Sequence, residues 1–343
     1  MDALGIYALA ASQLGRESAF ILESLSGPSR DRRATIIGLD PLFEVCIDEG
    51  QAQLRGCPAL CEHLSAHLQQ DGVQIDREHK IHLPDSEAAW NLLRAIQTAF
   101  QPAVNAPSSL AFFGYFSYDC VRLIERLPDL AEHTRGYPLI ALSVYQTLVY
   151  FHSNGIVETL INNHPLWASR ALEDYPFLNA TEPAETPDLP AYPEAFEETR
   201  TVSPAQFRER VELAMEHIRA GDIYQIQLGH EIRIRSQITP LDVYQNLRLR
   251  NPSPYMYLAH MGGIDLIGAS PELFVRIKDG LIEMRPIAGT VGKKPGVDPT
   301  ELVLELTRSQ KERAEHLMLI DLCRNDIGRV CQAGSLEVDE FML

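Results

Sequence analysis

The distribution of apolar and polar residues predicts a long helix from Ser309 to Arg329. Ser309 stands just before an apolar run and Glu312 follows three positions later. This spacing predicts a capping box, in which each side chain bonds a free backbone N–H of the first turn. The apolar side chains that follow surround most of the helix axis, so we expect burial on more than one side from about the second turn. They are Leu317, Met318, Leu319, Ile320 and Leu322.

Two carboxylates share one face of this predicted helix. Glu312 and Glu315 are three positions apart, which places their Cβ atoms roughly 5–6 Å from each other, with His316 beside them. Two close carboxylates repel unless a proton, water or a cation separates them, and a hard divalent ion such as Mg²⁺ suits oxygen ligands. The pattern alone leaves open that Glu312 only caps the helix, that Glu315 is a solvated first-turn acid and that His316 is a core residue.

In the first half of the chain, the pattern of apolar and turn residues predicts mostly strands and few helices. Turn residues and apolar runs predict strand, loop and strand over 18–41, a helix over about 86–100 and core architecture over 110–128. A long apolar strand over 139–151 leads to an Asn-Gly turn at 154–155 and a second strand through Ile161. This last pattern is typical of a hairpin.

The second half begins after a Pro- and Glu-rich connector at 179–200, which divides the chain into 1–178 and 201–343. Signals at Ser203, Pro204 and Gly221 predict a helix between them, and Thr239-Pro240 begins a short one. A period-two pattern predicts strands over 225–234, 264–269, 274–277 and 281–284.

The motif RPIAGT at 285–290 is a candidate ligand segment. A strand that ends at Gly289 leaves backbone N–H groups free, and Thr290 adds a hydroxyl; both suit an oxygen-rich ligand. An ordinary strand exit explains the same residues equally well.

Charge and composition exclude several classes of partner. The net charge is −17, from 47 acidic and 30 basic residues, which disfavours nucleic acid and anionic membranes. The N-terminus lacks the positive charge of a signal peptide, and the apolar run at 139–151 is too short to span a bilayer. The six cysteines show neither paired CxxC spacing nor the density of a disulfide scaffold. We therefore expect a cytoplasmic protein with reduced thiols and no membrane association.

The stretch KERAEHLMLIDLCRNDIGRV at 311–330 resembles the signature of chorismate-utilising enzymes, and specifically the large subunit of anthranilate synthase and its near relative aminodeoxychorismate synthase. GDIYQIQL at 221–228 and GASPE at 268–272 are similar to further motifs of that family. The resemblance implies an α+β fold, an anthranilate synthase-like sandwich of large, mostly antiparallel sheets with flanking helices. It also implies that Glu315 ligates the Mg²⁺ that holds the chorismate carboxylate, with Glu312 in the same acidic cluster.

The resemblance further implies the reaction. Gln225 occupies the position of a lysine proposed to activate water in isochorismate and salicylate synthases, and a neutral amide cannot act as that base. Ala288 occupies the position where aminodeoxychorismate synthases often carry a nucleophilic lysine. Ammonia is therefore expected to add directly to the ring, with Gln225, Gly289 and Thr290 as catalytic candidates and Ala288, Gly289 and Thr290 at the substrate. Loss of pyruvate would then yield anthranilate, the first step of tryptophan biosynthesis, with ammonia from a glutamine amidotransferase subunit.

Two other segments resemble the walls of the tryptophan feedback pocket of anthranilate synthases. One is Leu22–Ser24 and the other is NPSPYM at 251–256. The candidate tryptophan-binding residues are Glu23, Ser24, Asn251, Pro254, Tyr255 and Met256. The residues by themselves allow a buried polar pair that closes a strand end with equal weight.

Family members continue well beyond the position of Leu343, through a Gly-rich turn, a substrate-binding Arg, a catalytic His and a second group of Mg²⁺ ligands. We therefore expect this chain alone to be inactive and poorly soluble, because unpaired strands expose their edges. Two alternatives stay open at this stage. The enzyme can release 2-amino-2-deoxyisochorismate or aminodeoxychorismate instead of anthranilate, or the chain can be a non-catalytic tryptophan-binding module.

Overall fold

The computed structural model describes residues 2–27, 34–103, 110–128, 136–179, 196–292 and 296–341. Its contacts define two compact units. Unit 1 comprises Met1–Glu23, Arg33–Pro252 and Tyr257–Gly268, and unit 2 comprises Ser24–Arg32, Ser253–Met256 and Ala269–Leu343. Most of the predicted connector lies outside the described residues, so the division into 1–178 and 201–343 stays a prediction.

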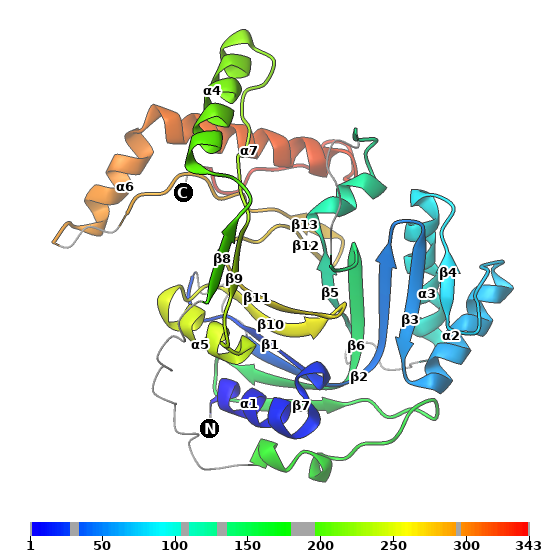
Figure 1. Cartoon of the computed structure of the whole chain (residues 1–343). Helices are drawn as coiled ribbons and strands as arrows, with labels where there is room; N and C mark the ends of the chain where they lie inside the picture. Colours follow the sequence, from blue (N-terminus) through cyan, green and yellow to red (C-terminus); the bar gives the residue numbers. More distant parts are fainter. Residues whose placement is uncertain are drawn as a thin grey trace. The chain divides into compact units, whose positions relative to one another are not determined.

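A nine-stranded sheet forms the frame of the described chain (Figure 1). Its main path runs β11-β10-β1-β2-β3-β4, and β6 pairs with β2, β5 and β7. The strands are β1 (Ala19–Glu23), β2 (Ala34–Asp48), β3 (Gln51–Gly56), β4 (Lys80–His82), β5 (Phe112–Phe116), β6 (Ile140–His152), β7 (Val157–Ile161), β10 (Tyr255–Met261) and β11 (Ile264–Ser270). The pairs β1–β2, β2–β3, β2–β6, β3–β4, β5–β6 and β6–β7 are antiparallel.

The sheet owes its length to β2, which runs past the end of the predicted strand. Asp40 has a left-handed backbone, with φ of 55°, and the register with β6 shifts between Pro41 and Phe43. The Asp40 carboxylate accepts a hydrogen bond from Tyr175 Oη at 2.8 Å and pairs with Arg170 Nε at 2.9 Å. These long-range partners stabilise a bend that the local sequence does not announce.

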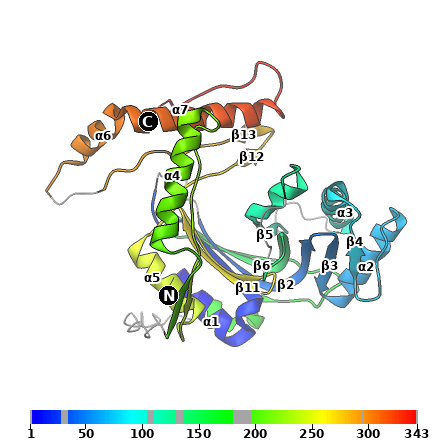
Figure 2. The same cartoon turned by 45° about the horizontal axis from the view of Figure 1, so that its top comes forward.

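Three helices pack on this sheet: α1 (Ala3–Leu14), α2 (Pro58–Gln70) and α3 (Ser86–Ala103). Figures 1 and 2 show α2 and α3 side by side next to β3 and β4. The predicted helix over 86–100 is confirmed, and Ala88 N–H donates to its cap residue Asp85 at 2.9 Å. A large buried cluster lies between these elements and includes Phe43, Val45, Leu54, Leu64, Leu92 and Ile96.

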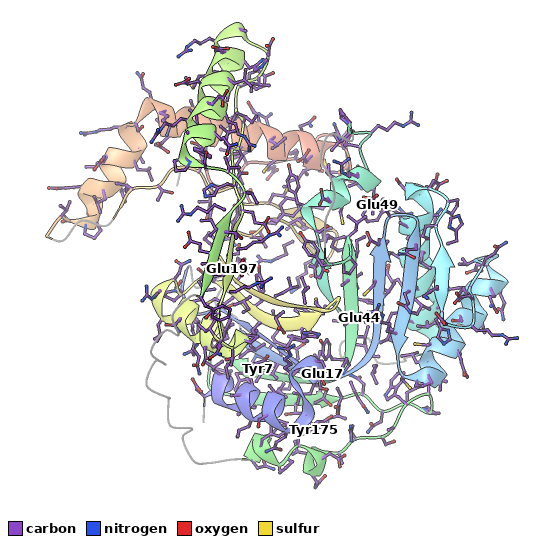
Figure 3. All side chains as sticks on the ribbon, viewed as in Figure 1. Tyr7, Glu17, Glu44, Glu49, Tyr175 and Glu197 are labelled. Atoms are coloured by element: carbon purple, nitrogen blue, oxygen red, sulfur yellow. The ribbon has the colours of Figure 1, made fainter. Side chains whose placement is uncertain are left out.

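Short 3-10 turns complete unit 1, at Arg16–Ser18, Tyr118–Leu123, Leu172–Asp174 and Pro176–Asn179. The predicted hairpin over 139–161 is confirmed as β6 and β7, with Gly155 at φ of 84°. Glu44 on β2, labelled in Figure 3, accepts the N–H of Gly262 at 2.9 Å and thereby fixes the turn between β10 and β11. Within the described residues, none of the helices combines the length and apolar character that crossing a membrane requires.

The region after the connector contains α4 (Pro204–Ala220), α5 (Pro240–Arg250) and a two-stranded sheet of β8 (Glu197–Arg200) and β9 (Ile232–Arg235). Both helices begin as predicted, with Ser203 as the cap of α4 and Thr239 as the cap of α5, and α4 ends at Gly221 as predicted. The predicted strand over 225–234 is wrong for residues 225–231. No backbone hydrogen bond joins residues 224–230 to another described residue. The alternation of apolar and polar residues gives the pattern of a strand, but a strand also requires a neighbouring strand with which it pairs.

Unit 2 contains β12 (Arg276–Lys278) and β13 (Leu281–Glu283), followed by α6 (Pro299–Arg308) and α7 (Gln310–Gly328). The helix predicted at 309–329 is confirmed, but its expected burial is wrong. Only Ile320 is buried, while Leu317 and Leu322 are 40% and 55% exposed, because unit 2 covers α7 with little more than α6 and irregular chain.

All six cysteines are free, as expected, and three of them, Cys46, Cys61 and Cys120, are buried in unit 1. Burial, followed by the charge of Glu44, raises the pKa of Cys46 to about 12. Burial, followed by the charge of Cys57, raises the pKa of Cys61 to about 11. Burial and then Asp265 raise the pKa of Tyr7, visible on α1 in Figure 3, to about 12.

Unit 1 is therefore expected to lose stability in alkali. A group whose pKa is raised in the folded state stabilises it below the unfolded pKa, and this contribution is lost as pH rises through the folded pKa. The window runs from about pH 9 to 12 for Cys46 and from about pH 9 to 11 for Cys61. Each is expected to lower the free energy of unfolding by about 1.4 kcal/mol per pH unit there. Urea unfolding at pH 8 and pH 10 measures the effect, and Cys46→Ala should reduce the slope; an equal slope would contradict this assignment.

Candidate active site

The two candidate catalytic segments, RPIAGT and α7, both belong to unit 2. Ser309 caps α7 and its hydroxyl accepts the N–H of Glu312 at 3.4 Å. The second half of the predicted capping box is wrong, because the Ser309 N–H is already bonded to the Leu306 carbonyl at 3.2 Å. The Glu312 carboxylate is thus not used as a cap.

Glu312 instead lies against the RPIAGT segment. Gly289 has φ of 80°, and a Cβ added there would stand 3.1 Å from Glu312 Oε2 and 3.0 Å from Leu306 Cδ1. A side chain at this position would be strained in the backbone and would push the Glu312 carboxylate and the end of the Leu306 side chain slightly aside. The structure therefore brings two residues that the sequence singled out separately, Gly289 and Glu312, into one site.

Glu312 and Glu315 on α7 are the candidate ligands of a divalent ion. The Glu312 side chain is 21% exposed and lies 3.3 Å from Lys311 Nζ, while Glu315 is half-buried one turn further along. Across the described ranges, no group of three or more His, Cys, Asp or Glu residues is arranged to hold a metal ion. Mg²⁺ keeps several waters and is often bound by one or two carboxylates together with substrate oxygens, and binding of such an ion by this pair stays a prediction.

Glu272 is a residue of this site to which the sequence assigned no role. Its Oε1 accepts the backbone N–H of Ile287 at 3.1 Å, which fixes the start of the RPIAGT segment. Its own N–H donates to Ser270 Oγ at 3.3 Å, a turn that holds the GASPE segment. Burial, followed by the charges of Asp326 and Glu272, raises the pKa of Cys323 on α7. GASPE was recognisable as a motif, but only the fold shows which backbone group its carboxylate binds.

Arg285 is a second residue without an assigned role. Its Nη2 donates to Tyr255 Oη at 3.4 Å and its Nε lies 3.5 Å from Glu283 Oε1. Arg276 Nη1 pairs with Glu283 Oε2 at 2.8 Å. This chain of polar contacts joins β12 and β13 to a residue of the NPSPYM segment.

The other catalytic candidates are less constrained by the structure. Ala288 is half-buried beside Gly289, and Thr290 is exposed. Gln225 lies in unit 1 on irregular chain and is exposed. Its participation in the site stays a prediction.

The two segments predicted to bind tryptophan are neighbours, since β1 and β10 are adjacent in the sheet. Leu25 N–H donates to the Ser253 carbonyl at 3.1 Å. Of the candidate residues, Pro254 and Met256 are buried, Ser24 and Tyr255 are half-buried, and Asn251 is exposed as the C-cap of α5. Glu23 is buried, and both of its carboxylate oxygens accept hydrogen bonds from α5. Binding of tryptophan by these residues stays a prediction.

Gly289→Ala is expected to weaken binding of chorismate with Mg²⁺ about tenfold or more, because a strained Ala at this φ costs roughly 1–2 kcal/mol and its Cβ displaces Glu312. Calorimetric titration of chorismate in the presence of Mg²⁺ measures the effect. Gly280→Ala is the matched control, because Gly280 lies in the same unit at φ of 78° with no atom within 4 Å of an added Cβ. Equal losses of chorismate affinity in both variants would show that the contact between residue 289 and Glu312 does not contribute to binding.

Comparison with known proteins shows the family of the chain. A model of the chorismate binding enzyme family matches residues 48–343. The chain is 40% identical to 2-amino-4-deoxychorismate synthase of Streptomyces globisporus, over 98% of this chain and 69% of that protein. It is 30% identical to anthranilate synthase component 1 of Acetivibrio thermocellus, over 94% of this chain and 65% of that protein.

A solved structure matches as well. Anthranilate synthase component I from Streptococcus pneumoniae superposes with a TM-score of 0.64 at 26% identity, over 93% of this chain and 66% of that one. The expected mixed fold of helices and antiparallel sheet is therefore confirmed. The chain spans about two thirds of the length of these relatives. With its RPIAGT segment against the acidic face of α7 and a family match that includes both, this chain belongs to the chorismate binding enzyme family.

Proposed function

We propose that this protein aminates chorismate. Ammonia adds through its lone pair to ring carbon C2, the two ring double bonds shift to C1–C6 and C4–C5, and the C4–oxygen bond breaks; the hydroxyl leaves with the extra ammonium proton as water. The product is 2-amino-4-deoxychorismate, which is the same compound as 2-amino-2-deoxyisochorismate. The observation that carries the proposal is the packing of Gly289, in a glycine-dependent conformation, against the Glu312 carboxylate.

In this proposal each segment of unit 2 has a defined task. Glu315 and Glu312 hold Mg²⁺, which supplies a Lewis acid and an anchor for the ring carboxylate when it is bound. Glu272 fixes the backbone at Ile287, so that Gly289 and Thr290 present their backbone and hydroxyl groups to the ring. Ala288 has no nucleophile, which favours direct attack by ammonia over a covalent intermediate.

Anthranilate formation is the second candidate. It requires a further elimination of pyruvate from the aminated ring, and a relative at 30% identity is an anthranilate synthase component 1. The relative at 40% identity is a 2-amino-4-deoxychorismate synthase, which favours release of the aminated compound. Both candidates share the amination step.

The proposal includes a partner, a regulator and a compartment. Ammonia comes from a glutamine amidotransferase subunit, as the resemblance implies. Tryptophan, or an amino acid of similar shape, binds the adjoining Leu22–Ser24 and NPSPYM segments, which the Leu25–Ser253 hydrogen bond joins. We propose a cytoplasmic location because six free cysteines are typical of a reducing compartment.

The test is ammonia-dependent conversion of chorismate by the full-length protein, with and without Mg²⁺, followed by mass analysis of the product. An aminated product that retains the pyruvyl group supports the first candidate, and fluorescent anthranilate supports the second. Binding of tryptophan without any turnover of chorismate would instead support the non-catalytic module. Turnover that does not depend on Mg²⁺ would contradict the proposal that Glu312 and Glu315 hold this ion.

A further inference from the structure

A buried polar cluster in unit 1 contains none of the residues proposed for the amination step. Glu23, the last residue of β1, has a side chain that is 2% exposed. Its Oε2 accepts hydrogen bonds from Tyr244 Oη at 2.8 Å and from Arg248 Nε at 2.9 Å, and its Oε1 accepts one from Arg248 Nη2 at 3.2 Å. Arg248 also lies 3.6 Å from Asp2, the N-cap of α1.

The geometry of this cluster is that of a two-pronged clamp. The Arg248 guanidinium donates two parallel N–H groups to the Glu23 carboxylate, which fixes the relative orientation of the two groups as well as the distance between them. Tyr244 is completely buried, and burial followed by the charge of Glu23 raises the pKa of its hydroxyl, so it stays a donor. Burial lowers the pKa of Arg248, but its bonds to Glu23 outweigh this and raise it. Glu23 is therefore neutralised within the chain and offers no unpaired charge to a ligand ammonium.

Both ends of the clamp lead directly into the segments that we propose bind an amino acid. On one side, Glu23 is followed by Ser24 and then by Leu25, which donates its N–H to Ser253. On the other, Arg248 lies in the last turn of α5, whose C-cap is Asn251. The clamp thus holds the end of β1 to the end of α5, three residues before the NPSPYM segment begins.

We propose that Arg248 and Tyr244 are positioning residues for amino-acid binding at Leu22–Ser24 and 251–256. They act through the Glu23 carboxylate, which bonds to these two side chains and not to the ligand. The inference rests on the proposed regulatory site and deepens it, because neither Tyr244 nor Arg248 belongs to the two motifs. A ligand that bridges these segments binds tightly only while the clamp keeps their backbones in register, since a loosened segment must be ordered on binding.

The experiment uses Tyr244→Phe, which removes one hydrogen bond and keeps the ring, and Arg248→Lys, which keeps the charge and loses the fork. Arg16→Lys is the matched control, since Arg16 forms an ion pair with Asp265 in the same unit at 3.1 Å. Calorimetry measures the Kd of L-tryptophan and, separately, of chorismate with Mg²⁺. Amide hydrogen exchange of residues 24–25 and 251–254 measures their order without ligand.

Tyr244→Phe and Arg248→Lys should each weaken tryptophan binding about tenfold, the change expected from one hydrogen bond to a charged group. They should accelerate exchange in both segments and leave the Kd of chorismate and the control variant unchanged. Faster exchange with unchanged tryptophan affinity would overturn the inference while the regulatory site survives. Unchanged exchange would overturn the clamp itself, and no tryptophan binding by the wild-type protein would overturn the regulatory proposal together with the inference.

Discussion

Replacing Glu315 with glutamine is expected to reduce Mg²⁺-dependent amination of chorismate by about 10²- to 10³-fold, the range typical of removing one preorganised group that stabilises developing charge. Glutamine keeps the size of the side chain and one oxygen but removes the negative charge that a hard cation requires. Because Glu312 shares the face, Glu312→Gln should cause a loss of the same kind. The double variant should lose little more, since residues that act as a unit are not additive.

The measurement is initial velocity at several Mg²⁺ concentrations. In Glu315→Gln the apparent affinity for Mg²⁺ should fall together with the velocity, and excess Mg²⁺ should restore part of the activity. Glu301→Gln is the control, because Glu301 is an exposed first-turn acid of α6 in the same unit. Wild-type Mg²⁺ dependence in Glu315→Gln would show that the ion is held elsewhere.

Arg248→Ala is expected to lower the free energy of unfolding by about 3–5 kcal/mol, because it leaves the buried Glu23 carboxylate without its ionic partner. The loss is large because desolvation of Glu23 is then uncompensated; the intact pair itself contributes less. Restoring neutrality with a second change, Glu23→Gln, should therefore recover part of the stability. Urea unfolding at neutral pH measures both variants.

An exposed ion pair provides the control for this prediction. Arg235 lies 3.3 Å from Glu197 across β8 and β9, with side chains 74% and 48% exposed. Arg235→Ala should cost no more than about 1 kcal/mol, since solvent screens such a pair. If Arg248→Ala were as mild as Arg235→Ala, Glu23 would be hydrated in solution and the clamp would contribute nothing to stability.

Local signals in the sequence were sufficient for elements whose ends are marked by caps and turns. The bounds of α4 follow from Ser203, Pro204 and Gly221, and the β6–β7 hairpin follows from Asn154-Gly155. Burial was predicted less well. The apolar residues of α7 indicated a buried helix, but burial depends on what packs around a helix, which its own sequence does not contain.

The candidate site was predicted only in parts. The motifs identified Gly289, Glu312 and Glu315 separately, and a resemblance assigned their chemistry. The contact between Gly289 and the Glu312 carboxylate required the fold, as did the bond from Ile287 N–H to Glu272. From the sequence, a carboxylate three residues after Ser309 is expected to cap the helix. In the structure, the Ser309 N–H that Glu312 would bind already donates to the Leu306 carbonyl.

By itself, the sequence determined the family and the order of the main helices and singled out candidate residues for the chemistry, because caps, turns and motifs act over a few neighbouring positions. Only the tertiary structure decided which of those residues meet. Glu23 and Arg248 are 225 positions apart, and nothing in either neighbourhood indicates the other. A buried carboxylate takes whatever donors the packing of distant elements brings within reach, so its partner follows from the fold.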